Sequence, residues 1–410
     1  MAQATDVHVA RQPIFDAHLK VFGYELLFRN KIHNIYRETD GEQATHDVIV
    51  NSFLLIGIET LTNGKKAFIN FTANSLKEQL PAILPPKLVA VEILEDIVPT
   101  EEIVRACRKL KKEGYLLVLD DFVFSPEYIP LVELADIIKV DFRATSSEEK
   151  RQLIQRLQGY SVKFLAEKVE TQEEFKEALQ MGYSYFQGYF FSKPVVMSGR
   201  NLSGYQANYF HILREISRPE LEFGQIEDII RKDVSLSYKL LKFINSPLFG
   251  FANKISSLRQ ALTLLGQKEL KKWVSLLALK GVSSNKPGEL TLQSLIRARF
   301  AENLAANKMP KSRMSNAFLM GMFSYIDVLL DRPLSEILDE IPLDDEVKNT
   351  LLGKDPSEFS MLYKVIQTYE KGDWETYSSF AKQMGVNDHD VLKSYRESLL
   401  WAHDVIICNG

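Results

Sequence analysis

Short, nearly continuous apolar runs recur along the first half of the chain, and longer stretches separate them in which apolar residues return every three or four positions. Such runs are typical of strands buried on both faces, and the three- to four-residue period of the stretches between them is that of amphipathic helices. The pattern predicts strands at residues 7–15, 21–29, 66–72, 87–94, 115–122, 136–142, 162–169 and 183–191.

Amphipathic helices are predicted between most of these strands. The clearest begins with Thr171 and Glu174 at capping-box spacing and ends at Gly182. No helix fits between the first two strands, where residues 16–20 predict a tight hairpin, so the first strand should run antiparallel to the rest. This alternation predicts a TIM-like α/β barrel. The predicted helices cover 42–61, 100–114, 147–159 and 171–182.

The pattern changes at residues 192–204, where Pro194, Gly199 and Gly204 predict a break. After the break nearly every apolar pattern has helical period. A chain of 410 residues is also too long for one ordinary core. We therefore predict a barrel domain over 1–197 and an all-helical domain over 200–410. The helical segments are 205–217, 226–245, 257–266, 269–281, 290–308, 313–330 and 391–408.

Composition and charge narrow the class of protein. A content of 45% hydrophobic and 25% charged residues is that of a soluble globular protein, and a net charge of −4 gives no support to nonspecific nucleic-acid binding. No signal peptide is recognisable, and no run approaches the ~18 apolar residues of a membrane span. Cys107 and Cys408 are expected to be free thiols. We expect a cytoplasmic protein that binds neither nucleic acid nor a membrane.

Residues that can bind a metal or a phosphate stand at the ends of successive predicted strands. A buried carboxylate is costly unless it is paired, and the strand ends of a barrel converge on one face. The series therefore predicts one ion site. Carboxylate and amide oxygens favour Mg²⁺ or Mn²⁺, and no cluster of His or Cys supports zinc. The residues are Glu25, Asn70, Glu92, Asp120, Asp121, Lys139, Asp141 and Glu167.

The consecutive carboxylates Asp120 and Asp121 are the most informative pair. One can bridge two cations while the other binds only one, and a two-metal site suits phosphodiester hydrolysis. Lys139 is suited to contact a phosphate oxygen or to orient the attacking water, and Arg29 to bind a phosphate with two hydrogen bonds. Taken singly, Glu25 is better explained by a salt bridge, and the aspartate pair equally well by a turn cap. Their common placement favours a functional site.

On these motifs, residues 7–197 resemble an EAL domain, the cyclic di-GMP phosphodiesterase fold. The combined set of motifs covers nearly the whole first half of the chain. The matching segments are RQPIF (11–15), YELLFR (24–29), FINFT (68–72), VEILE (91–95), DDF (120–122), KVD (139–141), AEKVET (166–171) and QGYFFSKP (187–194).

The resemblance implies an enzyme that opens one 3′–5′ bond of cyclic di-GMP and yields pGpG. It implies one Mg²⁺ or Mn²⁺ on Glu25, Asn70, Glu92 and Asp120, and a second on Asp120, Asp121 and Glu167. It also implies that Lys139 orients the water, that Asp141 and Gln187 complete the inner site, that Arg29 holds a substrate phosphate, and that Gln12 and Pro13 line the guanine side.

Three departures from the family pattern bear on activity. The signature reads Glu25-Leu26-Leu27, which keeps the ligand. Residues 123–130 contain no glycine, whereas active members carry a glycine-rich loop that steadies the second metal together with a glutamate, matched here by Glu95, and contributes to barrel dimerisation. Lys168 stands where the family has glycine. Weak activity, lost activity and partner-gated activity all remain open.

Residues 216–266 resemble the HDOD domain, a relative of the HD phosphohydrolases. The resemblance rests on the stretches 233–250 and 255–266. A hydrolase of the HD type needs clustered His and Asp ligands. The His-Asp pairs here begin at His46, His389 and His403, outside this core, and His211 is the remaining histidine of the second half. The resemblance therefore implies a module for interaction or sensing rather than for hydrolysis.

The favoured function is that of a bacterial signalling protein, in which a metal-dependent cyclic di-GMP phosphodiesterase is tuned by an HDOD domain that binds protein partners. A barrel homodimer would follow from the family pattern. The alternatives are an inactive EAL–HDOD scaffold that acts through partner proteins, and a receptor that binds cyclic di-GMP without cutting it.

Overall fold

The computed structural model describes residues 8–29, 57–188 and 212–409. The last range has gaps at 219–222, 232–233, 247–248, 250–254, 256, 283–287, 331, 342 and 355. The predicted helix over 42–61 falls mostly outside the described residues. The described residues resume at residue 57, directly before α2 (Ile58–Thr62).

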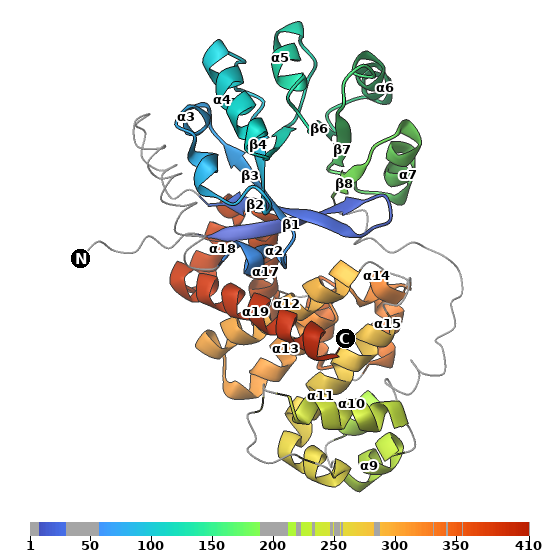
Figure 1. Cartoon of the computed structure of the whole chain (residues 1–410). Helices are drawn as coiled ribbons and strands as arrows, with labels where there is room; N and C mark the ends of the chain where they lie inside the picture. The colour runs from blue at the N-terminus through green and yellow to red at the C-terminus, as the bar shows by residue number, and fades with distance from the viewer. Residues whose placement is uncertain are drawn as a thin grey trace, which may run out of the picture. The chain divides into compact units, whose positions relative to one another are not determined.

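Eight strands close into a barrel in chain order, β1 to β8 (Figure 1). This confirms the predicted barrel. β1 runs antiparallel to both of its neighbours, β2 and β8, because a tight hairpin joins β1 directly to β2. The remaining neighbours pair in parallel. The strands are β1 (Val9–Asp16), β2 (Val21–Phe28), β3 (Lys66–Phe71), β4 (Val89–Ile93), β5 (Leu116–Leu119), β6 (Ile137–Asp141), β7 (Lys163–Glu167) and β8 (Tyr185–Gln187).

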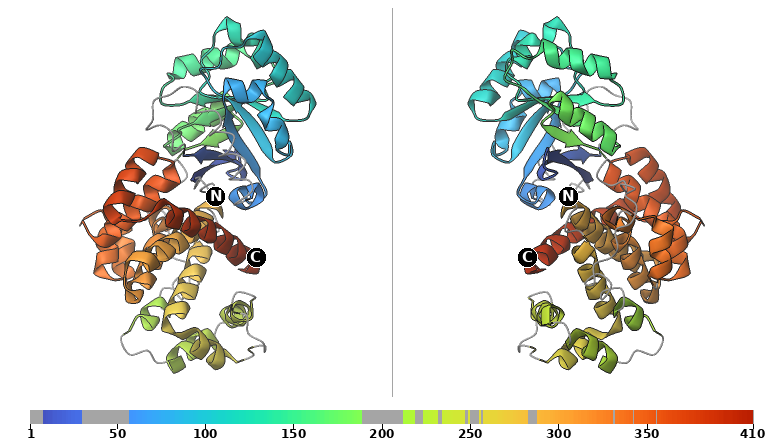
Figure 2. Two further views of the ribbon diagram at one scale, coloured as in Figure 1. Left: turned by 90° about the vertical axis from the view of Figure 1, so that its left-hand side faces the viewer. Right: turned by 90° about the vertical axis from the view of Figure 1, so that its right-hand side faces the viewer.

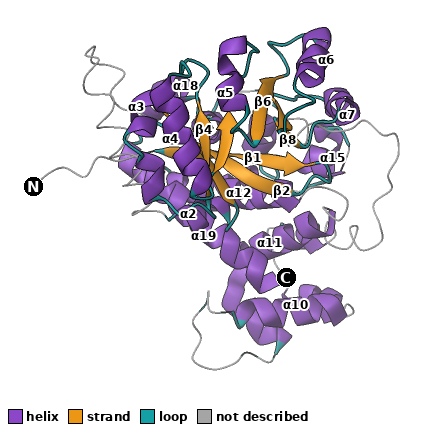
Figure 3. Ribbon diagram, turned by 45° about the horizontal axis from the view of Figure 1, so that its top comes forward, coloured by secondary structure: helices purple, strands orange, loops and turns teal. Residues whose placement is uncertain are grey.

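Helices connect the parallel strands and surround the sheet, drawn in purple around the orange strands of Figure 3. The capping box predicted at Thr171 is present, and a second one begins at Ser146. Large apolar side chains from the strands fill the barrel, among them Phe68 and Leu165. The connecting helices are α3 (Ala73–Lys77), α4 (Glu101–Lys112), α5 (Ile129–Val132), α6 (Ser147–Arg156) and α7 (Gln172–Met181).

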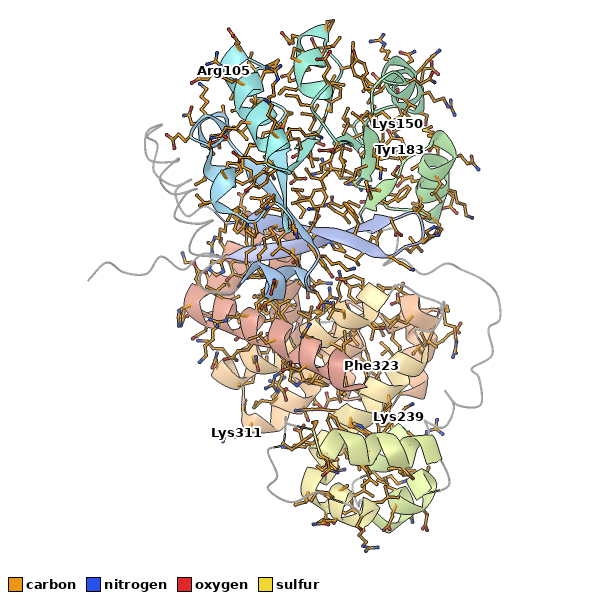
Figure 4. The ribbon with its side chains drawn as sticks, viewed as in Figure 1. Arg105, Lys150, Tyr183, Lys239, Lys311 and Phe323 are labelled. Atoms are coloured by element: carbon orange, nitrogen blue, oxygen red, sulfur yellow. The ribbon has the colours of Figure 1, made fainter. Side chains whose placement is uncertain are left out.

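Phe142 anchors the turn that follows β6. Lys150 of α6 donates a hydrogen bond to Phe142 O at 3.0 Å, and its Nζ lies 3.7 Å from the centroid of the Phe142 ring. The ring of Tyr183 packs edge-on against Phe142 at 5.2 Å (Figure 4 labels Lys150 and Tyr183). These contacts fix the backbone directly after Asp141, one of the predicted site residues.

The described part of the second half is helical, as the two views of Figure 2 show. Gly266 has φ 66° and ψ 173° inside α11, which separates the two helices predicted for this stretch. The helices are α9 (Phe223–Arg231), α10 (Val234–Ile244), α11 (Leu258–Val282), α12 (Gly288–Lys308), α13 (Met314–Met322), α14 (Ile326–Leu330), α15 (Leu334–Glu340), α16 (Asp345–Leu351), α17 (Glu358–Lys371), α18 (Trp374–Met384) and α19 (Asp388–Asn409). No described helix is both long and apolar enough to cross a lipid bilayer.

The chain divides into two compact units. The first comprises Met1–Lys193 together with Gln367–Ser378, and the second comprises Pro194–Ile366 together with Ser379–Gly410. The domain ranges 1–197 and 200–410 remain a prediction from the sequence. The segment Gln367–Ser378, which carries the end of α17 and the start of α18, therefore belongs with the barrel.

Candidate active site

The side chain of Lys139 lies at the centre of the carboxyl ends of the barrel strands. Its Nζ is 2.7 Å from a carboxylate oxygen of Asp120 and of Glu167, 2.9 Å from Glu92 and 3.6 Å from Glu25. Lys139 and Glu92 have no exposed surface, and Glu25 and Glu167 are buried. The predicted convergence of strand-end residues is therefore present, with a buried ammonium group at its centre.

Burial and charge oppose each other in this cluster. Burial raises the pKa of the Glu92 and Glu167 carboxyls above their usual range, and the neighbouring Lys139 pulls both back only in part. Burial alone would lower the pKa of Lys139, but the four carboxylates together raise it well above its usual value. Lys139 therefore stays protonated, and the site carries more carboxylates than one ammonium group neutralises.

Several oxygen atoms of the cluster suit a divalent cation. Among the described residues, no donor makes a hydrogen bond of acceptable geometry to Asn70 Oδ1 or to either oxygen of Glu92, although one of these oxygens lies 2.9 Å from Lys139 Nζ. Asn70 and Glu92 are direct partners across β3 and β4. Asp120, Asp121 and Glu167 each offer an oxygen, and these three atoms lie within 4.8 Å of one another. Hard oxygen donors with unused acceptor capacity fit Mg²⁺ or Mn²⁺.

A second ammonium group, that of Lys168, lies beside Asp121. Lys168 Nζ is 2.5 Å from Asp141 Oδ2 and 3.4 Å from Asp121 Oδ2. The other oxygen of Asp141 accepts from the backbone N–H groups of Arg143 and Ala144 at 2.7 and 3.0 Å. Burial would raise the pKa of Asp141, but these hydrogen bonds and the charge of Lys168 lower it. Lys168 thus binds one oxygen of the carboxylate predicted to hold the second metal.

The backbone at this end of the barrel departs from ordinary conformations at Asp121 (φ 37°) and Lys168 (φ 54°). Both values lie in the left-handed region, which costs a side-chain-bearing residue about 1–2 kcal/mol. Lys168 occupies the position at which the EAL pattern has glycine, the residue for which this region is free of strain.

The loop after Asp121 folds without glycine. Residues 126–128 form a short 3₁₀ helix that leads into α5, and neither Val123 nor Phe124 has a positive φ. The left-handed conformation in this stretch falls on Asp121 instead. Val123 is exposed, with 81% of its surface accessible. Glu95, the predicted partner of this loop, is exposed, and its backbone carbonyl accepts a hydrogen bond from Tyr128 at 3.1 Å.

A pocket opens over the cluster. Among the predicted site residues it is lined by Gln12, Glu25, Asp120, Asp121, Lys139, Glu167 and Gln187. Gln187 Nε2 donates to Glu25 Oε2 at 2.5 Å and to Gln12 Oε1 at 3.2 Å, so one amide group orients both neighbours. The other predicted site residues, Pro13, Arg29, Asn70, Glu92, Glu95 and Asp141, do not line this pocket.

Sequence reasoning missed several pocket residues. Leu27, Arg143, Glu170 and Gly188 line the pocket, and Arg143 forms an ion pair with Glu170. Arg143 follows Asp141 by two positions, so its place directly after a strand was the available signal. His389 and His403 lie on α19, while His46 and His211 fall outside the described residues.

Family models place the chain in a known class. The EAL domain model matches residues 32–194, and the HDOD domain model matches residues 204–340. The chain belongs to the EAL family and carries an HDOD domain after the EAL barrel, as the sequence motifs predicted.

Two relatives match nearly the whole chain. The uncharacterized protein YuxH of Bacillus subtilis is 41% identical over 408 residues, 98% of this chain and 99% of its own length. The cyclic di-GMP phosphodiesterase CdgJ of Vibrio cholerae is 38% identical over 401 residues, 97% of this chain and 93% of its own. Both alignments therefore span the EAL and the HDOD regions of this chain.

Among solved structures, the manganese and cyclic di-GMP complex of BlrP1 from Klebsiella pneumoniae is 22% identical. The match covers 46% of this chain and 56% of that one, with a TM-score of 0.39.

Proposed function

We propose that this protein is a divalent-metal-dependent phosphodiesterase that hydrolyses cyclic di-GMP to pGpG, and that its helical half regulates the barrel and binds signalling partners. The observation that carries the proposal is the convergence of four strand-end carboxylates on Lys139 beneath an open pocket. The name of the full-length relative CdgJ points to the same substrate.

The carboxylates have distinct roles in this proposal. Glu25, Asn70, Glu92 and Asp120 would hold one Mg²⁺ or Mn²⁺ ion, and Asp120, Asp121 and Glu167 the other. Two such ions, when bound, supply a nucleophilic water at neutral pH and stabilise charge on the phosphate oxygens. The unsatisfied oxygens of Asn70 and Glu92 and the close set of Asp120, Asp121 and Glu167 support this division.

The remaining residues would bind and orient. Lys139 Nζ, protonated and surrounded by carboxylates, would donate a hydrogen bond to the attacking water. Gln187 holds Glu25 and Gln12 in place through its amide group. Arg29 would bind a phosphate of the substrate, and Gln12 with Pro13 the guanine side. Asp141 supports the adjoining turn, and Glu95 would act from the loop beside it.

A second candidate function is a receptor or scaffold that does not cut the nucleotide. The observation that favours it is Lys168, whose ammonium group binds Asp121 and Asp141 where the second ion would need the Asp121 carboxylate. In either form we place the protein in the cytoplasm, with a barrel homodimer as the assembly that the family pattern implies.

Full-length protein incubated with cyclic di-GMP and Mn²⁺ is expected to release pGpG. Chromatography measures the product. Replacing a metal ligand, Glu25→Ala or Asp120→Ala, should lower kcat by at least about 100-fold, since even outer-shell changes at metal sites cost 10–100-fold. The matched control is Glu101→Ala, which alters an exposed carboxylate on α4. Turnover that survives both ligand variants contradicts the proposal. Binding without product, equal in the wild type and Glu101→Ala, supports the receptor instead.

A further inference from the structure

A segment from near the end of the chain is part of the barrel unit. We call Gln367–Ser378 the returning segment. Its side chains Tyr369 and Tyr377 are fully buried, and their ring centroids lie 5.7 and 5.9 Å from that of His8. Tyr369 also donates a hydrogen bond to Val9 O at 3.3 Å. Buried aromatic packing of this kind anchors the returning segment to the start of β1.

The returning segment contacts two residues assigned to substrate binding. Arg29 Nη2 donates a hydrogen bond to Ser378 Oγ at 2.7 Å, and the guanidinium carbon lies 5.3 Å from the centroid of the Tyr377 ring. Gln12 Nε2 donates to Lys371 O at 3.2 Å. Arg29 is absent from the pocket lining, whereas Gln12 belongs to it. Arg29 therefore contacts the returning segment and does not line the pocket.

We propose that Ser378 is a positioning residue that holds Arg29 away from the pocket and thereby sets the affinity of the barrel for cyclic di-GMP. This inference rests on the proposed function, in which Arg29 binds a substrate phosphate. A phosphate offers the planar guanidinium two charged acceptors, whereas Ser378 offers one neutral hydroxyl. Substrate therefore wins the exchange, but its apparent affinity is reduced by the fraction of molecules in which Arg29 is held.

The contacts that fix the returning segment to the barrel are distinct from those that bind Arg29 and Gln12. The aromatic anchor is buried, whereas the hydrogen bonds to Arg29 and Gln12 lie at its margin, partly buried and exposed respectively. Only the margin must rearrange when substrate binds. Both helices that form the returning segment continue into residues of the second unit, α17 from Glu358 and α18 to Met384. The polypeptide chain thus connects Ser378 directly to the helical half, so that a ligand or partner bound there can shift Ser378.

The test is the variant Ser378→Ala in the full-length protein. Alanine keeps the helix and removes the hydroxyl that accepts from Arg29. We expect KM for cyclic di-GMP, and Kd from titration with the nucleotide, to fall about 3- to 10-fold, the value of one hydrogen bond, while kcat stays within about twofold. The control is Ser379→Ala, whose hydroxyl is the neighbouring one and accepts from Gln383 instead.

A second pair of variants tests the effect of the returning segment on Arg29 without changing a direct partner of Arg29. Gly372 has φ 68°, and a Cβ there would lie 2.6 Å from Leu27 Cδ1, so Gly372→Ala should loosen the segment and also lower Kd. Gly353 has a φ of 67° with open space around it, so Gly353→Ala matches the strain alone.

An unchanged or raised Kd in Ser378→Ala overturns the proposal, because Ser378 would then pack passively or orient Arg29 toward the substrate. An equal fall of Kd in Gly353→Ala and Gly372→Ala also overturns it. If neither the wild type nor any variant binds cyclic di-GMP, the proposed function fails and this inference with it. An unchanged Kd in Ser378→Ala, by contrast, overturns this inference alone.

Discussion

Replacing Lys139 by methionine is expected to destabilise the barrel by about 3–5 kcal/mol in metal-free solution, the usual cost of removing one partner from a buried ionic cluster. Four carboxylates surround Lys139 Nζ, and the side chain is buried. Methionine fills a similar volume, so the loss is mainly one of charge. Urea-induced unfolding of the full-length protein measures it.

The same variant should respond strongly to a divalent ion. Mn²⁺ at 100 times its Kd stabilises a protein by about 2.7 kcal/mol, and in Lys139→Met it also supplies positive charge that the carboxylates have lost. Saturating Mn²⁺ should therefore stabilise Lys139→Met more than the wild type. Lys163→Met, the same change at an exposed residue of β7, is the control and should follow the wild type. An equal response of all three proteins would argue that the cluster binds no cation.

Replacing Lys168 by glycine is expected to raise the affinity for Mn²⁺ about tenfold, because the ammonium group at Asp121 and Asp141 is removed. The change should also stabilise the protein by about 1 kcal/mol, since Lys168 has a left-handed backbone that glycine adopts without strain. Calorimetric titration with Mn²⁺ measures the affinity, and urea-induced unfolding in metal-free solution measures the stability.

Two further variants separate charge from backbone. Lys168→Met removes the charge and keeps the side-chain bulk, so it should reproduce the gain in metal affinity without the gain in stability. Leu19→Gly relieves a comparable left-handed residue, with φ 58°, in the hairpin between β1 and β2, so it should leave metal affinity unchanged. Metal affinity that is the same in Lys168→Met and the wild type would exclude Lys168 as a competitor of the second ion.

The fold and the site cluster follow from sequence patterns that are local. Each barrel strand is a short apolar run, and parallel strands must place their carboxyl ends together, so the sequence alone predicts that Glu25, Glu92 and Glu167 meet. The capping box at Thr171 is equally local, because its two partners lie three positions apart. Such features need no knowledge of distant contacts.

The parts that sequence could not supply depend on distant contacts or on backbone conformation. The hydrogen bond from Arg29 to Ser378 joins residues 349 positions apart, and no period or motif marks it. The ion pair of Lys168 with Asp141 joins the ends of neighbouring strands, and Lys168 has a left-handed backbone there. The sequence identified Lys168 as unusual but gave no sign of which carboxylates it would reach.

The most direct test of the account is a crystal structure of the full-length protein with cyclic di-GMP and Mn²⁺, in which anomalous scattering locates the metal. We expect manganese within about 2.5 Å of oxygens from Glu25, Asn70, Glu92 and Asp120, with a phosphate of the nucleotide on the same ion. Nucleotide bound in the pocket with no manganese at these oxygens, or manganese bound only elsewhere, would contradict a metal-dependent phosphodiesterase site at the strand ends.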